Sequence, residues 1–403
     1  MDLDLDIFTT LALASAALVI GRALTERIAL LSKYSIPDAV VGGMLFAVVI
    51  TLARGAGSVR IDFDPALLTP LNVMFFTTVG LSADARALVK GGRLLILFFA
   101  IVALGLVMQN AIGVGMVKLF DLHPVSGLLA GSITLSGGHG TAAAWGQKFA
   151  EERNLQGAVE LGIAAATYGL VVGGLLGGPL ASFLMRRFSI RGTGSSAAAA
   201  QTDGSQDTVT LPSLSASELI ETLLLVFVSM ALGFALFRWI GQGALTLPSF
   251  IWALLVGVVL RNALSLSGLY RVKDRALDLI GALALSLFLA MIIMTLKLWE
   301  LVDLAGPILA TLLVQTAALL AYVTFVTFRF MGRNYDAVLL ATGHLGFSLG
   351  STATAMVNVQ AVANRHGHSA LAFLLIPIMG AFLIDLANAF AIQGYLTLPW
   401  FTW

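Results

Sequence analysis

The amino-acid sequence predicts an all-α polytopic membrane protein made of two inverted five-helix repeats, each holding a re-entrant hairpin. Three observations lead to this prediction. The 403-residue chain is 58% hydrophobic and 11% charged, with a mean hydropathy of +0.94, whereas about 25% of the residues of a soluble domain are charged. Ten apolar segments are long enough to be membrane spans. Two glycine-rich stretches, LLAGSITLSGGHGTAAA at Leu128 to Ala144 and LLATGHLGFSLGSTATA at Leu339 to Ala355, align without a gap.

The first repeat, residues 1–188, is expected to contribute five spans, near 7–30, 38–53, 66–83, 94–118 and 155–185. The N-terminus has no basic region or cleavage site of a secretory signal, so the first apolar run is expected to remain in the protein as a span. Residues 189–217 have no apolar period and predict a flexible linker. The second repeat, residues 218–403, is expected to contribute spans near 218–240, 247–262, 279–297, 305–328 and 369–396.

A polar, glycine-rich stretch lies between the fourth and fifth span of each repeat, at about 124–147 and 336–356. Such a broken segment would leave backbone groups unsatisfied in hydrocarbon if it faced lipid. We therefore expect each stretch to be a re-entrant hairpin buried in protein. Interrupted segments at corresponding positions of two halves indicate the binding site of a transporter.

The distribution of basic residues predicts the orientation. Five spans per repeat invert the second repeat, and basic residues collect in the short loops on the cytoplasmic side. With the N-terminus outside, sixteen Lys and Arg residues fall on the inner side and seven on the outer side. Both termini are therefore predicted to be periplasmic and the linker cytoplasmic. The two hairpins then enter from opposite sides, and their tips are expected to meet near the midplane.

Composition also excludes some classes of function. The net charge of +1 and the lack of a basic tract disfavour a nucleic-acid partner. The absence of cysteine excludes disulfides and thiolate chemistry. The apolar composition makes the lipid bilayer the expected surroundings.

The two hairpin tips are the candidate substrate site. Glycines let the backbone approach a ligand closely, and the TAAAW sequence from Thr141 is expected to begin a half-helix whose N-terminus binds a carboxylate. The second tip repeats this pattern, so two such ends suit a dicarboxylic substrate. The alternative is that these small residues only allow close helix packing. The candidate residues are Ser136, Gly137, Gly138, His139, Gly140, Thr141, Ser348, Gly350, Ser351 and Thr352.

The histidine and amide side chains near the tips could have a functional or a structural role. His139 is expected either to contact substrate or relay protons, or to be a neutral histidine satisfied by local backbone; the second interpretation is favoured for His344. Gln109, Asn110 and Gln315 are mid-membrane amides. We expect them to bridge helices.

One carboxylate lies within the last span of each repeat, Glu160 in the first and Asp385 in the second. A charge there is costly and usually functional. Asp385 lies deep in its span, and Asn388 follows one turn later on the same side. The pair is expected to supply oxygens for Na⁺, together with carbonyls from the tips. Glu160 is a candidate Na⁺ ligand or, equally, an interfacial carboxylate in a salt bridge.

The sequence resembles the bacterial sodium/glutamate symporters over almost its whole length. The likeness is carried by seven motifs, at Ile36 to Leu45, Leu106 to Met116, Leu128 to Thr141, Ser286 to Met291, Leu296 to Leu301, Gly343 to Ala355 and Ile384 to Ala389. The resemblance implies Na⁺-coupled uptake of L-glutamate at the inner membrane, with no cofactor besides the coupling ion. It also implies inverted repeats with re-entrant loops in a homodimer. The second tip departs from the family pattern at Ser348, Ser351 and Ala353, so the choice among small acidic anions stays open.

This architecture suggests a mechanism. Na⁺ would neutralise Asp385 and order the tips, which would then bind the substrate carboxylates, so that each ligand raises the affinity for the other. The fourth and fifth spans and hairpin of each repeat would move together as a transport unit against a scaffold of the remaining helices, an elevator-type arrangement.

Other functions share some of these sequence features. A Na⁺/H⁺ antiporter, or a Na⁺-coupled carrier of another small organic anion, fits inverted repeats and buried carboxylates as well. An intramembrane hydrolase would pair Ser136 with His139, but the second tip has no matching pair, so the chain is not expected to be an enzyme. A passive channel is disfavoured because the two hairpins are unequal.

Overall fold

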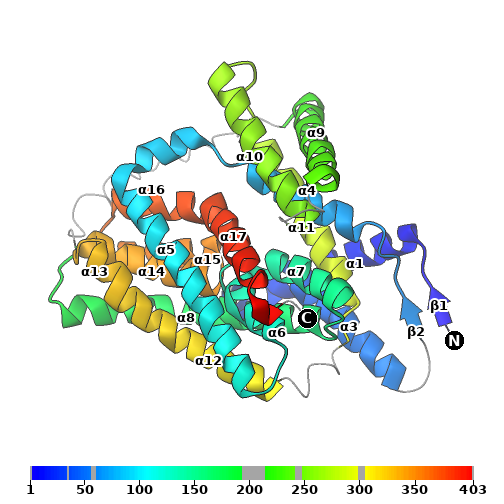
Figure 1. The fold of residues 1–403 in the computed structure, drawn as a ribbon, viewed down its shortest axis with the longest axis horizontal. Helices are drawn as coiled ribbons and strands as arrows, with labels where there is room; N and C mark the ends of the chain where they lie inside the picture. The colour runs from blue at the N-terminus through cyan, green and yellow to red at the C-terminus, as the bar shows by residue number, and fades with distance from the viewer. Residues whose placement is uncertain are drawn as a thin grey trace.

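The computed structural model describes residues 2–33, 36–55, 60–192, 214–240, 247–297 and 305–401. Residues 193–213, most of the expected linker, and residues 298–301 of the Leu296 to Leu301 motif lie outside this part of the chain. The described residues are almost entirely helical (Figure 1).

The first half of the chain begins with a short strand and continues in helices. Its elements are β1 (Asp2–Asp4), α1 (Ile7–Arg27), α2 (Ala29–Lys33), α3 (Asp38–Gly55), β2 (Arg60–Asp62), α4 (Leu68–Leu81), α5 (Ala85–Leu119), α6 (Pro124–Leu128), the π-helical turn η1 (Leu129–Ile133), α7 (Gly138–Arg153) and α8 (Ala158–Arg187).

The second half follows a similar order. Its elements are α9 (Ala216–Ile240), α10 (Ser249–Ser267), α11 (Asp274–Met294), α12 (Ala305–Tyr322), the π-helical turn η3 (Val323–Thr327), α13 (Phe328–Phe330), α14 (Tyr335–Leu349), α15 (Thr352–His366), α16 (Ala370–Ile378), the π-helical turn η4 (Met379–Leu383), α17 (Ile384–Leu396) and η5 (Pro399–Phe401).

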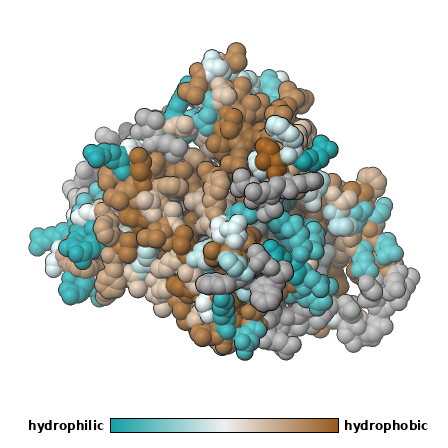
Figure 2. All heavy atoms as spheres, in the orientation of Figure 1, coloured by the Kyte–Doolittle hydropathy of each residue, from teal (hydrophilic) through white to brown (hydrophobic). Residues whose placement is uncertain are grey.

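Seven helices within the described residues are long and apolar enough to cross a bilayer, and three shorter apolar helices accompany them. Hydrophobic side chains cover broad areas of the visible face, and hydrophilic side chains form separate patches (Figure 2). Large apolar residues such as Phe8, Trp239 and Leu266 are exposed, which a soluble protein avoids over large areas. The chain is therefore a multi-pass membrane protein.

Three local features differ from the expectation. Strands β1 and β2 form a small parallel pair that the sequence did not predict. Helix α5 begins at Ala85, nine residues before the expected start at 94, because Asp84 caps it and a kink at Gly92 (φ 55°) joins the extra turns to the apolar part. The last expected span is interrupted by η4 after Pro377, because proline cannot donate the usual helical hydrogen bond.

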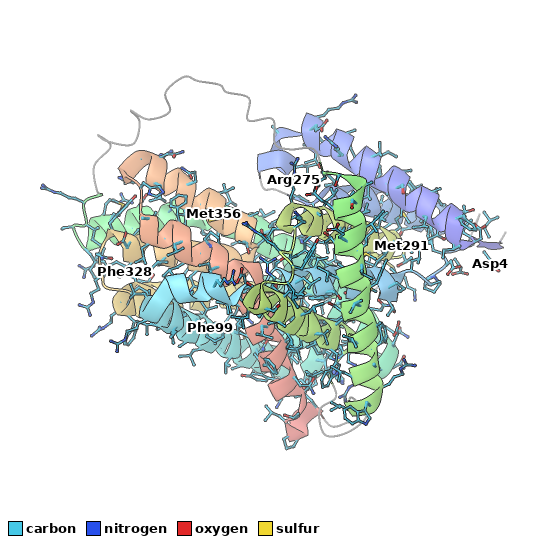
Figure 3. All side chains as sticks on the ribbon, turned by 90° about the horizontal axis from the view of Figure 1, so that it is seen from above. Asp4, Phe99, Arg275, Met291, Phe328 and Met356 are labelled. Carbon is cyan, nitrogen blue, oxygen red and sulfur yellow. The ribbon has the colours of Figure 1, made fainter. Side chains whose placement is uncertain are left out.

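The helices pack in two groups. Helices α1, α3, α4, α9, α10 and α11 contact one another, and a second group contains α5 to α8 and α12 to α17. The first group lies toward the right and top of Figure 1, the second toward the left, with α7 between them. In Figure 3, Phe99, Phe328 and Met356 lie in the second group and Met291 in the first. The more extensive contacts between the groups join α7 to α11 and α4 to η4.

Helix α14 lies at the centre of the second group, where every residue except Asp336 is buried. A glycine face of α8 allows it to approach α14 closely. A Cβ at Gly169 would lie only 2.0 Å from the Leu349 carbonyl oxygen, so no larger residue fits there. The glycine-rich stretch from 169 to 178 thus packs within the subunit at Gly169, Gly173 and Gly177, whereas Gly178 has open space beside it.

Candidate functional site

The two glycine-rich stretches are each broken in the middle, and the breaks meet. The first break lies at Ser136 and Gly137, between η1 and α7, and the second at Gly350 and Ser351, between α14 and α15. Gly138 has a φ of 68°, which favours glycine. A Cβ at Gly138 would lie 3.5 Å from the Gly350 carbonyl oxygen. Segments more than 200 residues apart in the sequence are therefore in contact.

One amide side chain bonds to both broken segments. Gln109 of α5 donates from Nε2 to the Ser348 carbonyl oxygen at 2.8 Å, and its Oε1 accepts from the Ser136 hydroxyl at 2.6 Å. All three groups are buried. A buried polar group that loses its partner is costly, so Gln109 fixes the relative position of the two breaks.

A second polar cluster connects the first break to α17. Ser132 in η1 donates its backbone N–H to Asn110 Oδ1 at 3.1 Å, and the Ser132 hydroxyl lies 2.8 Å from the same oxygen. The hydroxyl also lies 2.5 Å from Asn388 Oδ1, and Asn388 Nδ2 donates to the Ser132 carbonyl at 2.9 Å. Since a hydroxyl has one proton, it donates to one of the two amide oxygens at a time.

Two buried amide atoms beside this cluster have no hydrogen-bond partner in the described part of the chain. Gln315 of α12 donates to the Gln109 carbonyl at 2.6 Å, but Gln315 Oε1 and Asn110 Nδ2 are buried without a hydrogen-bond partner in the described part of the chain. Unpaired buried amides are rare in native structures. The junction therefore has a spare acceptor and a spare donor. As expected from the sequence, Gln109, Asn110 and Gln315 bridge helices.

Helix α7 begins at Gly138, so the expected half-helix start at Thr141 was three residues too late. The left-handed conformation of Gly138 starts the helix within the glycine run. No side chain caps this end, because the N-cap residue is Gly137. The first-turn N–H groups, which lack helical acceptors, are thus free of a side-chain partner at the point where the breaks meet.

Helix α15 begins at Thr352, as its motif suggested. Its N-cap residue, Ser351, accepts the Thr354 N–H at 3.2 Å. Thr352 donates to the Gly380 carbonyl at 2.8 Å, which holds the start of α15 against η4. Gly137, Gly138, Ser351 and Thr352 are partly exposed, whereas the neighbouring Ser136, Gly140, Thr141, Ser348 and Gly350 are buried.

The His139 side chain points to α8. Its Nε2 lies 3.1 Å from the Thr167 hydroxyl, which itself donates to the Ile163 carbonyl at 2.8 Å. Because the Thr167 hydroxyl proton is donated to the Ile163 carbonyl, the hydroxyl oxygen accepts, and His139 Nε2 must donate to it. In a neutral ring, Nδ1 then carries the lone pair. The Ser136 hydroxyl bonds to Gln109 and not to His139, so the two do not form a nucleophile and base pair.

His344 lies away from the breaks, in the middle of α14. Its Nδ1 is 2.9 Å from the Thr327 hydroxyl in η3, and its ring contacts Phe98, Tyr322 and Phe347. His344 is fully buried. The packing indicates a structural role, but the expectation that local backbone satisfies the ring was wrong. The partner of Nδ1 is a side-chain hydroxyl, and Nε2 is buried without a hydrogen-bond partner in the described part of the chain.

The three candidate Na⁺ ligands occupy different environments. Asp385, in the first turn of α17, is partly exposed, and its carboxylate has no hydrogen bond or ion pair with any residue that the structure describes. Both polar atoms of Asn388 bond to Ser132. Glu160 accepts the backbone N–H of Lys297 at 2.7 Å, so it joins the start of α8 to the segment that follows α11. No three His, Cys, Asp or Glu residues in the described ranges gather into a metal site.

A cavity of about 390 Å³ begins near the second break. It follows the groove between α8 and α15, from Thr354 and Asn358 to Arg365 and His366. The distribution of basic residues predicts that Arg365 lies on the cytoplasmic side.

The sequence did not single out Ser132 as part of the site. Ser132 lies in the π-helical turn η1, and such turns are frequent at functional sites. Residue types alone do not show where a π-helical turn forms, so the sequence offered no way to find Ser132. The bridging role of Gln109 was anticipated, although its two partners were not.

Comparison with known proteins identifies relatives over nearly the whole chain. The family model described as "Sodium/glutamate symporter" matches residues 3–368. Proteins named sodium/glutamate symporter from Escherichia coli (strain K12) and Shigella flexneri are each 44% identical over 98% of this chain and 99% of their own length. The Haemophilus influenzae protein of the same name is 44% identical over 95% of both chains.

Proposed function

Because this chain belongs to the sodium/glutamate symporter family, we propose that it couples the entry of Na⁺ to the uptake of L-glutamate. The structural observation that carries the proposal is the contact between the two helix breaks at Gly138 and Gly350. The family consists of transporters, so the chain is not an enzyme, and Na⁺ serves as the coupling ion. The bacterial inner membrane is the expected location.

The substrate site is proposed at the meeting point of the breaks. The free first-turn N–H groups of α7 bind one carboxylate of glutamate, since helix N-termini favour anions. The start of α15 binds the other carboxylate. Hydroxyls and backbone groups complete the contacts, from Ser136, Gly137, Gly138, His139, Gly140, Thr141, Ser348, Gly350, Ser351 and Thr352.

Asp385 is proposed as the carboxylate that binds Na⁺. It has no partner among the described side chains. Thr352, at the start of α15, bonds to Gly380 in η4, the turn that leads directly into α17. Asn388 Oδ1 has a second lone pair and faces the first break through Ser132, so Asn388 is the second proposed ligand. For Glu160, the bond to Lys297 favours an anchoring role over the Na⁺ role that remains its alternative.

Coupling follows from the shared polar network. Na⁺ at Asp385 and Asn388 orders Ser132 and the first break, and the ordered break binds glutamate. By linkage, glutamate raises the affinity for Na⁺ by the same factor. The unpaired Asn110 Nδ2 and Gln315 Oε1 can hydrogen-bond to a water or ligand bound within this network.

Transport is proposed to occur by movement of the second helix group against the first, the elevator-type arrangement of inverted repeats with re-entrant hairpins. The backbone packing supports this proposal, since the helices of each group contact one another more extensively than they contact the other group. Both termini are proposed to be periplasmic and the linker cytoplasmic. The protein is proposed to be a homodimer, as the family resemblance implies.

The test is uptake of radiolabelled L-glutamate into proteoliposomes with external Na⁺, and then with K⁺ in its place. Uptake only with Na⁺ is the expected result. Na⁺ flux against a pH gradient without an organic solute would instead favour a Na⁺/H⁺ antiporter. If another small organic anion inhibits the Na⁺-driven uptake more strongly than unlabelled glutamate does, that anion is the substrate, and the proposal of Na⁺ coupling stands.

A further inference from the structure

A second polar cavity, separate from the helix breaks, lies between the first turn of α5 and the first helix group. It has a volume of about 420 Å³ and lies where the α4–α5 turn meets the connection between α10 and α11. Its lining includes three arginines and two aspartates, namely Arg86, Arg261, Arg271, Asp84 and Asp274. No part of the proposed symport cycle uses these residues.

Arg261 forms the floor of this cavity. It is buried, and its side chain is only 10% exposed. It donates to Asp274 at 2.6 Å and to Asp84 at 3.5 Å. The buried charge is thereby compensated, and both carboxylates of the cavity are directed toward Arg261. Both aspartates pair with Arg261, and three arginines against two aspartates leave the lining with a net positive charge.

The other two arginines, Arg86 and Arg271, have guanidinium N–H groups that are free to bind a ligand. Arg86, in the first turn of α5, is exposed and bonds to the Ser265 carbonyl through one guanidinium nitrogen. Arg271 is exposed and has no hydrogen bond or ion pair with a described residue. A guanidinium has five N–H donors. The cavity thus presents two incompletely satisfied guanidinium groups, whose planar forks match phosphate oxygens.

The backbone around the cavity adds to this preference for an anion. Helix α11 begins at Asp274 on the cavity wall, and no side chain caps its first turn. Its N–H groups favour a negative charge. Gly268, with a φ of 68°, ends α10 at the cavity and has open space beside it, so a ligand can approach the backbone there.

Apolar residues beside the cavity point to the source of the anion. Leu266 is 78% exposed and Leu269 is 82% exposed. Both flank the lining residues Ser265, Gly268 and Tyr270 in sequence. Exposed leucines next to arginines suit a molecule that has an anionic head and hydrocarbon chains. The basic residues also assign this face to the cytoplasmic side, where anionic lipids attract cations. Arg275, labelled in Figure 3, marks the first turn of α11.

We propose that the cavity lined by Arg86, Arg261 and Arg271 binds the phosphodiester headgroup of an anionic phospholipid from the inner leaflet. Arg86 and Arg271 donate hydrogen bonds to the phosphate oxygens, and the buried Arg261 adds its positive charge. The acyl chains lie against Leu266 and Leu269. The lipid holds the α4–α5 turn, including the first turn of α5, against the α10–α11 connection of the first helix group.

The test is native mass spectrometry of the purified, delipidated protein after addition of phosphatidylglycerol or, separately, phosphatidylcholine. The test variant is Arg86→Gln with Arg271→Gln. The matched control is Arg329→Gln with Arg333→Gln, two exposed arginines of the second helix group that are predicted to lie on the same side. Inorganic phosphate, added in competition, distinguishes a lipid headgroup from a free anion. Where the double variant does not fold, Arg271→Gln alone carries the test.

The wild type is expected to retain phosphatidylglycerol and not phosphatidylcholine. Retention is expected to fall about tenfold or more in the test variant, the size expected for a lost charge-assisted hydrogen bond, and to stay unchanged in the control. Equal retention of both lipids, or equal loss in both variants, would overturn the proposal. So would displacement of the lipid by millimolar phosphate. Glutamate uptake measured in parallel reports separately on the symport function.

Discussion

Gln109 Nε2 donates to the Ser348 carbonyl at 2.8 Å and thereby joins α5 to the last turn of α14. The same side chain accepts from the Ser136 hydroxyl. A single residue of a long helix therefore positions both broken segments, which belong to opposite halves of the sequence. This bridge makes the two breaks one site.

The bridge predicts the effect of Gln109→Leu. Leucine leaves the Ser348 carbonyl and the Ser136 hydroxyl unpaired, at a cost of about 1–3 kcal/mol for each buried group. We expect Na⁺-driven uptake, measured as kcat/KM in proteoliposomes, to fall at least about tenfold. The control is Gln360→Leu, an exposed glutamine of α15 that bonds only to Asn364 in the described part of the chain. Equal activity of the two variants would contradict the role of Gln109.

Gly138→Ala tests the contact between the breaks. Alanine is strained at a φ of 68°, by about 1–2 kcal/mol, and the strain falls at the contact, because its Cβ would lie 3.5 Å from the Gly350 carbonyl oxygen. Uptake is expected to fall while the protein remains folded. Gly115→Ala in α5 is the control, because nothing lies within 4 Å of its Cβ position and alanine is the better helix former. Unimpaired uptake in Gly138→Ala would place the substrate elsewhere.

The Ser132 and Asn388 pair is expected to be energetically coupled. Ser132→Ala and Asn388→Ala each remove one side of a buried bond network. A double-mutant cycle of thermal or denaturant unfolding should give a coupling energy of about 1 kcal/mol or more. Additive effects would mean that the contact contributes nothing specific. The control pair is Gln360→Ala with Asn364→Ala, an exposed bond on α15.

Movement between the helix groups is testable by cross-linking, because the chain contains no cysteine. Gly140 of α7 lies against Leu285 of α11, since a Cβ at Gly140 would be 3.0 Å from Leu285 Cδ1. Because Gly140 also belongs to the proposed substrate site, the reference is the unlinked double-cysteine variant of these two positions. A short thiol cross-linker is expected to stop the uptake that this variant retains, and reduction of a cleavable linker should restore uptake to the unlinked level. Cysteines at Glu221 of α9 and at Tyr270, whose side chains are joined by a 2.8 Å hydrogen bond within the first group, should leave uptake unchanged. Full uptake by the linked Gly140 and Leu285 pair would exclude this movement.

The sequence predicted the membrane class and the positions of most helices, because long apolar segments separated by polar turns specify them directly. It missed the start of α7 because a run of glycines offers no periodicity, and the left-handed Gly138 fixes the start only in the fold. The β1–β2 pair was missed because strands of three residues carry no pattern.

The candidate site was located by the two glycine-rich stretches, whereas its internal bonds depend on tertiary structure. Nothing in the residue types near Gln109 shows that Ser136 and Ser348 are its partners. The π-helical turns η1, η3 and η4 place Ser132, Thr327 and the start of α17, and each depends on packing against neighbouring helices. The roles of Asp385 and Glu160 remain predictions.

The most direct test of the shared site is equilibrium binding of radiolabelled L-glutamate to the purified protein at rising Na⁺ concentrations. The wild type and Asp385→Asn are compared, with Asp278→Asn of α11 as the control. We expect Na⁺ to lower the Kd for glutamate in the wild type and the control, and to lose this effect in Asp385→Asn. A Kd that is independent of Na⁺ in the wild type, or a Na⁺ effect that persists in Asp385→Asn, would contradict the proposal that Na⁺ at Asp385 orders the glutamate site.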